Sequence, residues 1–176
     1  EGIHQMLLCD INPYVRFACR ISFKSQTATF NVFDSRLFYI LKGSIEIDID
    51  SHKYILSEGS VFFCSASSIY SIRSDGCDLY SLNFDLDQSR NNFSKCCPPV
   101  TLYNDQLPVF TERTDLQDCD FLNGHLFIPS GGRYLDAFEE IVNEITQEMI
   151  FYREKASALL KELLIEIHRH SQKTDK

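Results

Sequence analysis

The sequence predicts a mainly β domain, a sandwich or barrel of short strands, followed by two C-terminal helices. Three observations lead to this prediction. Short apolar segments typical of strands recur through the first two-thirds of the chain, and turns marked by glycine separate them. After Gly132 the apolar residues recur every three or four positions instead, as they do on a helix. The 176 residues are enough for one full-sized core with a helical extension.

The clearest strand is predicted over residues 44–50. Three isoleucines alternate there with Glu and Asp, and a period of two places all three on one face of a half-buried strand. The run 37–41 before it is continuously apolar, as expected for a more central strand, and Lys42-Gly43 is predicted to form a turn between the two.

Further short strands are predicted at regular intervals, with turns at Glu58-Gly59 and Asp75-Gly76. The segment 87–124 is polar and rich in Asn, Asp, Cys and Pro, so we expect a long surface connection there. The remaining predicted strands are 53–56, 61–64, 69–72, 79–86, 100–103 within that connection, and a closing strand at 125–128.

Two amphipathic helices are predicted at the C-terminal end, the first over about 135–149. After a break near 152–155, the second helix presents an apolar face about 140° wide, broader than a coiled-coil seam. Such a face can contact two neighbours, the rest of the chain and a second copy, although packing on the β domain alone is an alternative. Its apolar residues are Ala156, Leu159, Leu160, Leu163, Leu164 and Ile167.

The composition narrows the function classes. A formal net charge of −8 disfavours contact with a phosphate backbone, so we expect this chain not to bind DNA by itself. Seven cysteines without a Cys-x-x-Cys pair argue against a zinc ribbon or a disulfide framework and favour reduced thiols in a cytoplasmic protein. The sequence also has no apolar run of the roughly 20 residues that a membrane span needs.

Four segments resemble the sensor domain of AraC-type bacterial transcription regulators. They are LFYILKGSIEIDID, an apolar run and an alternating strand around a Gly; LSEGSVFFCSASSIYSI, similar to the second cupin motif; LYSLNFDL; and ASALLKELLIEI, similar to a Leu-rich dimerisation helix. Together they span roughly residues 15–170. The resemblance implies a cupin-type jelly-roll barrel over 1–130, a helical dimerisation segment over 131–170, and from 171 to 176 the start of a linker to an absent DNA-binding domain.

The resemblance also predicts that no metal or other cofactor is bound. Metal-binding cupins use three His and one Glu, and imidazole and carboxylate groups suit Fe, Mn, Ni or Zn. The positions that match these four ligands hold Thr29, Asn31, Arg36 and Tyr70. An arginine side chain stays protonated and cannot ligate a metal.

The same positions form the predicted effector site inside the barrel. An inward-pointing Arg36 needs an anion, because an unpaired buried charge is expensive. One alternative is an internal carboxylate, from Asp34, Glu46 or Asp85, and the other is an anionic group of the effector. The predicted effector-binding residues are Thr29, Asn31, Arg36, Phe38, Ile40 and Tyr70.

The sequence therefore predicts a ligand-sensing and dimerisation domain with no catalytic residues, which controls a C-terminal helix-turn-helix domain. The expected partners are a small-molecule effector and a second copy of the chain, with DNA bound only through the missing domain and no membrane. Two alternatives stay open: a metal-free cupin enzyme of the sugar epimerase or isomerase type, for which His125 is the only base placed near the barrel, and a free-standing dimeric small-molecule-binding cupin. The predicted dimer interface consists of Leu160, Leu163, Leu164 and Ile167.

Overall fold

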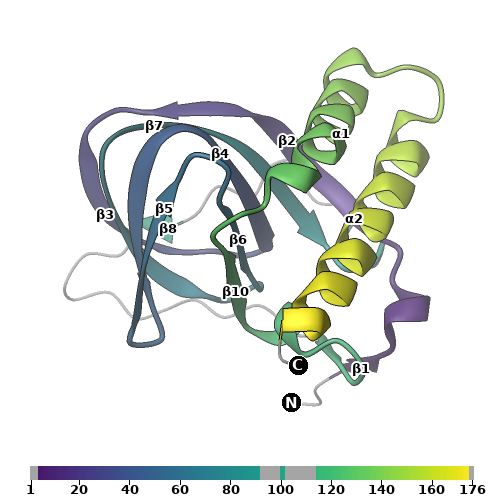
Figure 1. The fold of residues 1–176 in the computed structure, drawn as a ribbon. Coiled ribbons are helices and arrows are strands. Elements are labelled where there is room, and N and C mark those ends of the chain that lie inside the picture. Colours follow the sequence, from purple (N-terminus) through teal and green to yellow (C-terminus); the bar gives the residue numbers. More distant parts are fainter. Residues whose placement is uncertain (1–3, 92–99, 102–113, 175–176) are drawn as a thin grey trace.

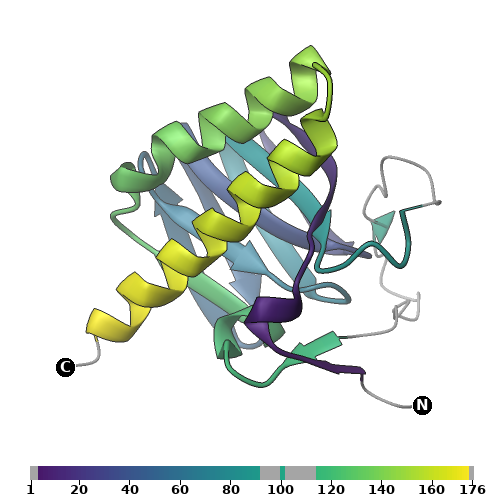
Figure 2. The ribbon, with the colours of Figure 1, turned by 90° about the vertical axis from the view of Figure 1, so that its right-hand side faces the viewer.

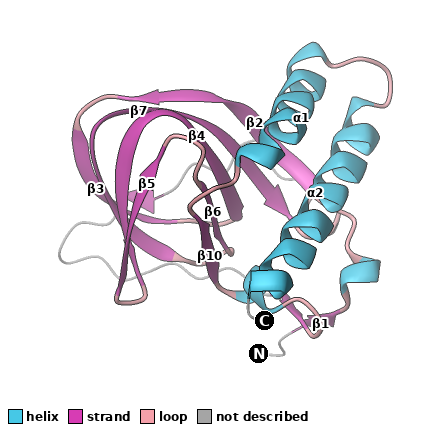
Figure 3. Ribbon diagram, in the orientation of Figure 1, coloured by secondary structure: helices cyan, strands magenta, loops and turns pink. Residues whose placement is uncertain are grey.

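The computed structural model describes residues 4–91, 100–101 and 114–174. A bent antiparallel barrel occupies one side of the molecule, and two helices lie against it (Figures 1 and 3). The strands are β1 (His4–Met6), β2 (Tyr14–Phe23), β3 (Gln26–Asn31), β4 (Ser35–Ile49), β5 (His52–Ser57), β6 (Val61–Cys64), β7 (Ile69–Asp85), β8 (Val100–Thr101), β9 (Thr114–Leu116) and β10 (His125–Ile128). The helices are α1 (Leu135–Gln147) and α2 (Tyr152–Thr174).

The two longest strands, β4 and β7, organise the barrel. They pair with each other antiparallel along most of their length, and every other barrel strand except β8 and β10 pairs with one of them. The strand order is β10-β6-β4-β7-β3-β8, with β2 also paired to β7 and β5 to β4. Outside the barrel, β1 and β9 form a short parallel pair. The predicted fold class, a mainly β barrel followed by two C-terminal helices, is confirmed.

Two predicted turns lie inside continuous strands. The Lys42-Gly43 turn is a bend in β4, and the Asp75-Gly76 turn is a bend in β7, so the predicted strands 69–72 and 79–86 form one element. Both glycines have positive φ, at +78° and +144°. They lie side by side at the corner of the barrel, where a Cβ on Gly43 would come within 2.3 Å of the Gly76 carbonyl oxygen. Glycine therefore bends this sheet without ending its strands.

The alternation of side chains along β4 separates two hydrophobic cores. Phe38 and Ile40 point into the barrel and join one core with residues of β6 and β7. Leu37 and Tyr39 point the other way and join a second core, which lies between the barrel and the helices. The continuous apolar run of residues 37–41 is thus explained by burial of both faces.

Both helices pack on the outer face of the barrel, and Figure 2 shows them crossing the same sheet. Leu160, Leu163, Leu164 and Ile167, which were predicted to form the dimer interface, are at most 2% exposed and belong to the second core. The argument that one chain cannot cover this face is therefore wrong. The barrel, α1 and the N-terminal segment around Ile11 cover it together.

The remaining differences concern two strands that were not predicted, β2 and β3, and the ends of other elements. The first helix was predicted to end at Met149, whereas α1 ends at Gln147 and Glu148 follows with φ +48°. The second helix begins at Tyr152 and continues to Thr174, through residues assigned to the linker. Of the predicted strand 100–103, β8 covers the first two residues, and the rest lies outside the described residues.

We expect Leu164→Ala to lower the free energy of unfolding by about 2–5 kcal/mol, because it leaves a cavity between α2 and the barrel. Leu159→Ala is the matched control on the same helix, and since Leu159 is only partly buried, its loss should be clearly smaller. Urea unfolding followed by circular dichroism measures both. Equal and small losses in the two variants would contradict the packing of α2 on the barrel.

Candidate functional site

Four of the six predicted effector-binding residues lie together inside the barrel. Arg36, Phe38 and Ile40 follow one another on the inner face of β4, and Tyr70 lies on the inner face of β7. The rings of Phe38 and Tyr70 are 6.5 Å apart between centroids, in an edge-to-face arrangement. The structure thus brings these residues into one interior cluster, while their role in binding stays a prediction.

The placement of Thr29 and Asn31 in this cluster is wrong. Phe30, between them on β3, packs its ring 5.9 Å from that of Tyr70, so Phe30 points into the barrel. Successive residues of a strand face opposite sides, and the two predicted residues therefore lie on the other face. There the Thr29 hydroxyl is 2.7 Å from the hydroxyl of Ser71, the residue opposite it on β7. Counting backwards from Gly43 gave a register on β3 that is wrong by one residue.

Apolar side chains fill the barrel interior beyond Arg36. Phe38 and Tyr70 are at most 6% exposed, and Phe62 stacks on Phe38 with ring centroids 6.3 Å apart. Burial raises the pKa of the Tyr70 hydroxyl well above its usual value and that of the Cys64 thiol to about 12, so both groups stay protonated. The interior in this conformation is a packed core.

The end of the barrel next to this core is charged. The Arg36 side chain donates from Nε to Asp34 Oδ1 at 2.8 Å, and both residues are buried. The second oxygen, Asp34 Oδ2, is buried and has no hydrogen-bond partner among the described residues. Burial raises the pKa of Asp34 to about 6, against the opposing effect of the Arg36 charge. Of the three carboxylates predicted as partners for Arg36, Asp34 forms the ion pair.

A second ion-pair cluster lies beside the first. Asp85, at the end of β7, accepts from Arg16 Nε at 2.9 Å and from Arg90 Nη2 at 2.5 Å. Arg16 is almost fully buried, and its Nη2 also donates to the Arg90 carbonyl oxygen at 2.9 Å. Sequence reasoning missed Arg16 and Arg90 as site residues. Arg16 lies on a strand that was not predicted, and 69 residues separate it from Asp85.

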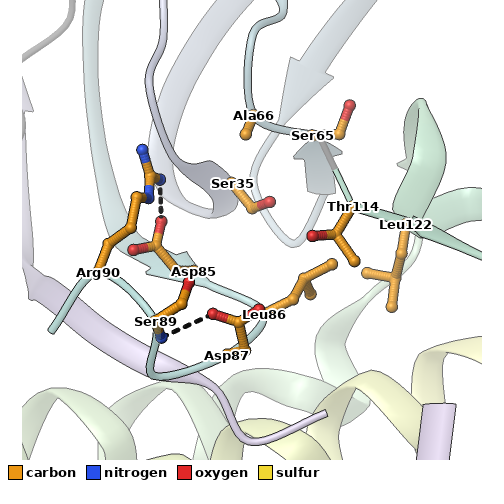
Figure 4. Close-up of a pocket in the computed structure, with 10 residues that line it drawn as sticks. All are labelled: Ser35, Ser65, Ala66, Asp85, Leu86, Asp87, Ser89, Arg90, Thr114 and Leu122. Carbon is orange, nitrogen blue, oxygen red and sulfur yellow. Dashed lines mark hydrogen bonds and ion pairs between the residues drawn. The ribbon is translucent and has the colours of Figure 1, made fainter. Parts of the chain in front are cut away.

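Two pockets open at this end of the molecule. The smaller, of about 90 Å³, lies beside the Asp85–Arg90 ion pair and is also lined by the hydroxyls of Ser35, Ser65 and Thr114 (Figure 4). The larger, of about 470 Å³, lies between β2, the turn after β7 and the start of α2. Ligand pockets for small molecules typically have volumes of about 300–1,000 Å³, so the larger pocket has room for a metabolite and the smaller one has room for little more than water.

His125, the base considered for an enzymatic role, connects two strands at another part of the barrel. Its Nε2 is 3.0 Å from the Tyr54 hydroxyl on β5, and its Nδ1 is 3.3 Å from Asp50 Oδ2. Tyr54 also packs against Phe127, the second residue after His125 on β10. Both nitrogens of the imidazole thus face protein groups, an arrangement that suits a structural role.

Two further properties follow from the described residues. They contain no group of three or more His, Cys, Asp or Glu side chains placed to hold a metal ion, and the expectation of a metal-free barrel stays a prediction. None of the helices in this part of the chain combines the length and the apolar character that a membrane-spanning segment needs.

Comparison with known proteins shows similarity in structure rather than in sequence. No family model and no curated protein sequence matches the chain. Among solved structures, apo ToxT K231A from Vibrio cholerae aligns over 94% of this chain and 57% of its own, with a TM-score of 0.53 and 16% identity.

Partial matches include the EutQ protein of Clostridium difficile, with TM-score 0.37, 20% identity and 40% of this chain against 56% of its own. A cupin superfamily protein of Desulfitobacterium hafniense aligns with TM-score 0.34 and 25% identity, and the alignment covers 40% of this chain and 65% of its own. The chain therefore spans between about half and two-thirds of each of these proteins. The alignment with ToxT, at a TM-score of 0.53, supports a shared fold, which in this chain is a mainly β barrel with two C-terminal helices.

The raised pKa of Asp34 predicts a specific pH dependence of stability. The pKa is about 6 in the folded protein and about 3.9 in an unfolded chain. The folded protein therefore holds the proton more tightly, and its free energy of unfolding should fall as the pH rises from about 4 to 6, by about 3 kcal/mol.

Urea unfolding between pH 4 and 7 tests this, with Asp34→Asn as the variant that lacks the titrating group. The exposed Asp120→Asn is the control, and it should follow the unmodified protein. Parallel pH profiles for Asp34→Asn and the unmodified protein would show that Asp34 titrates normally.

Proposed function

We propose that this chain is the ligand-sensing and dimerisation domain of an AraC-type transcription regulator. The similarity to ToxT, an AraC-family regulator, carries the proposal, because it extends over 94% of the chain and includes the two helices as well as the barrel. The regulator binds DNA through a helix-turn-helix domain outside this sequence and works in the cytoplasm.

The contacts of the polar barrel residues argue against a catalytic role. Arg36 matches the position at which metal-binding cupins carry a Glu ligand, and its guanidinium is engaged by Asp34. His125 is held between Tyr54 and Asp50. Proton transfer needs a base within reach of a substrate, and these contacts favour a domain without enzymatic activity or cofactor.

The proposed dimer uses the outer faces of the helices, since the predicted leucine stripe is buried. A groove of about 380 Å³ runs between α1 and α2, and Ala137, Leu159 and Leu163 give it an apolar floor. Of the four residues first predicted for the interface, only Leu163 lines this groove. The edge of the groove is acidic, with Glu140, Glu162 and Glu166 among its residues. In a dimer whose two-fold axis passes through the groove, these carboxylates would face those of the second copy.

The proposal predicts that residues 1–176 alone do not bind DNA and that a longer form of the protein does. Residues 1–176, with a net charge of −8, should give no mobility shift with duplex DNA even at low salt, where non-specific binding is strongest. A protein extended by the natural sequence that follows Lys176 should bind a specific duplex, and a ligand should change its affinity. A shift by residues 1–176 alone, or no DNA binding by the extended protein, would contradict the proposal.

We expect sedimentation equilibrium to show a homodimer whose dissociation constant falls as salt is added, because salt screens the repulsion between the acidic groove edges. Ala137→Glu places a further charge in the groove floor and should weaken the dimer at least tenfold. Ala158→Glu, an exposed position on α2 outside the groove, is the charge-matched control and should leave the dimer intact. A monomer at high micromolar concentration would exclude the dimer.

A further inference from the structure

The larger pocket at the charged end of the molecule joins the barrel to the helices. Tyr14 lies on β2, Gln88 and Asn91 lie in the turn that follows β7, and Arg153 lies in the first turn of α2. Its volume is about 470 Å³, within the range of sites that hold small metabolites. Three different parts of the chain thus enclose one space.

Arg153 is held in place by aromatic rings rather than by carboxylates. Its guanidinium carbon is 5.2 Å from the ring centroid of Tyr14 and 5.1 Å from that of Tyr152. Such contacts fix the position of a guanidinium without using its N–H groups. Arg153 forms no ion pair with any residue in the part of the chain that the structure describes. Its donors are therefore positioned in the pocket wall for an anionic group, preferably a planar carboxylate that can accept two parallel hydrogen bonds.

The other groups of the pocket restrict the ligand further. The Gln88 amide nitrogen already donates to the carbonyl oxygens of Asn12 and Pro13, and Asn12 Oδ1 accepts from Ser157. Gln88 Oε1, the Asn12 amide nitrogen and the Asn91 carboxamide can still bind hydroxyl, amino or carbonyl groups of a ligand. Glu154 also lines the pocket, next to Arg153 along the chain. A doubly charged phosphate would lie close to this carboxylate, so a singly charged acid is favoured.

We propose that this pocket is the effector site and that it binds a small monocarboxylic acid carrying additional polar groups. The carboxylate pairs with Arg153, and the polar groups bind the carboxamides. This inference rests on the proposed function and specifies its ligand class and its site, which lies at the junction of β2 with α2 instead of inside the barrel.

The position of the pocket explains how a ligand would affect the helices. Among the described residues, three hydrogen bonds join the N-terminal segment to α2: Ser157 Oγ donates to Asn12 Oδ1 at 3.0 Å, and Lys161 Nζ donates to the carbonyl oxygens of Cys9 and Ile11 at 2.8 Å. A ligand held by Arg153 and Asn12 adds to the same junction. Binding should therefore restrain the first turns of α2 relative to the barrel.

Isothermal titration calorimetry of residues 1–176 tests the proposal with five probes: lactate, gluconate, 4-hydroxybenzoate, anthranilate and inorganic phosphate. We expect at least one carboxylate to bind with a millimolar or lower dissociation constant and phosphate to bind more weakly. Arg153→Gln should weaken binding on the order of 10- to 100-fold, as expected for loss of a charged hydrogen-bonding group. Arg133→Gln, an exposed arginine outside this pocket, is the charge-matched control and should bind normally.

Hydrogen exchange with the same probe gives a second readout, because the amides at the start of α2 should be protected by the ligand in the unmodified protein and not in Arg153→Gln. Equal weakening in both arginine variants would assign the effect to overall charge and overturn the site. Binding of phosphate alone, or of none of the probes, would overturn the ligand class. If the extended regulator responds to an effector and Arg153→Gln responds equally, the proposed function stands and this site is excluded.

Discussion

The pairing of β4 with β7 is the constraint on which the rest of the structure depends. Both strands are long, and both are buried on their two faces over much of their length, so the molecule has to supply a cover for each side. The barrel covers one side by closing on itself around Phe38 and Ile40. The helices cover the other side by packing on Leu37 and Tyr39. The bend at Gly43 and Gly76 makes closure possible without a break in either strand.

The buried charges at the end of the barrel reduce the stability of the folded protein. Burying a charge costs free energy unless it is paired, and replacing buried ion pairs with apolar side chains is often neutral or stabilising. Arg16, Asp34, Arg36 and Asp85 are nevertheless all at most 8% exposed. The unmatched oxygen of Asp34 shows that the pairing is incomplete among the described residues. An arrangement of this kind does not maximise stability, and it lies beside the two pockets that open at this end.

Sequence patterns within a few residues of one another predicted most of the fold, but they predicted few of the residues at the candidate site. The alternating isoleucines of β4 and the periodicity of both helices depend on neighbours within a few residues, and they were predicted. The bend at Gly76 was taken for a turn because a glycine signals a change of direction but not whether pairing continues. The register of β3 was wrong by one residue because it was counted across the connection at 32–34, whose length the sequence does not fix. Arg16 pairs with Asp85 and Arg153 contacts Tyr14, and because each of these two partners lies in a distant part of the chain, no local pattern identifies it.

The leucine stripe of α2 has a consequence for the integrity of the domain. The barrel interior has a hydrophobic core of its own, but Leu160, Leu164 and Ile167 share the second core with the outward-facing residues of the barrel, so its outer face depends on the helices for burial. A chain shortened at residue 130 would expose the apolar face around Tyr39 and Phe63 to water. Barrel and helices therefore form a single cooperative folding unit, so they would be expressed, unfolded and degraded together.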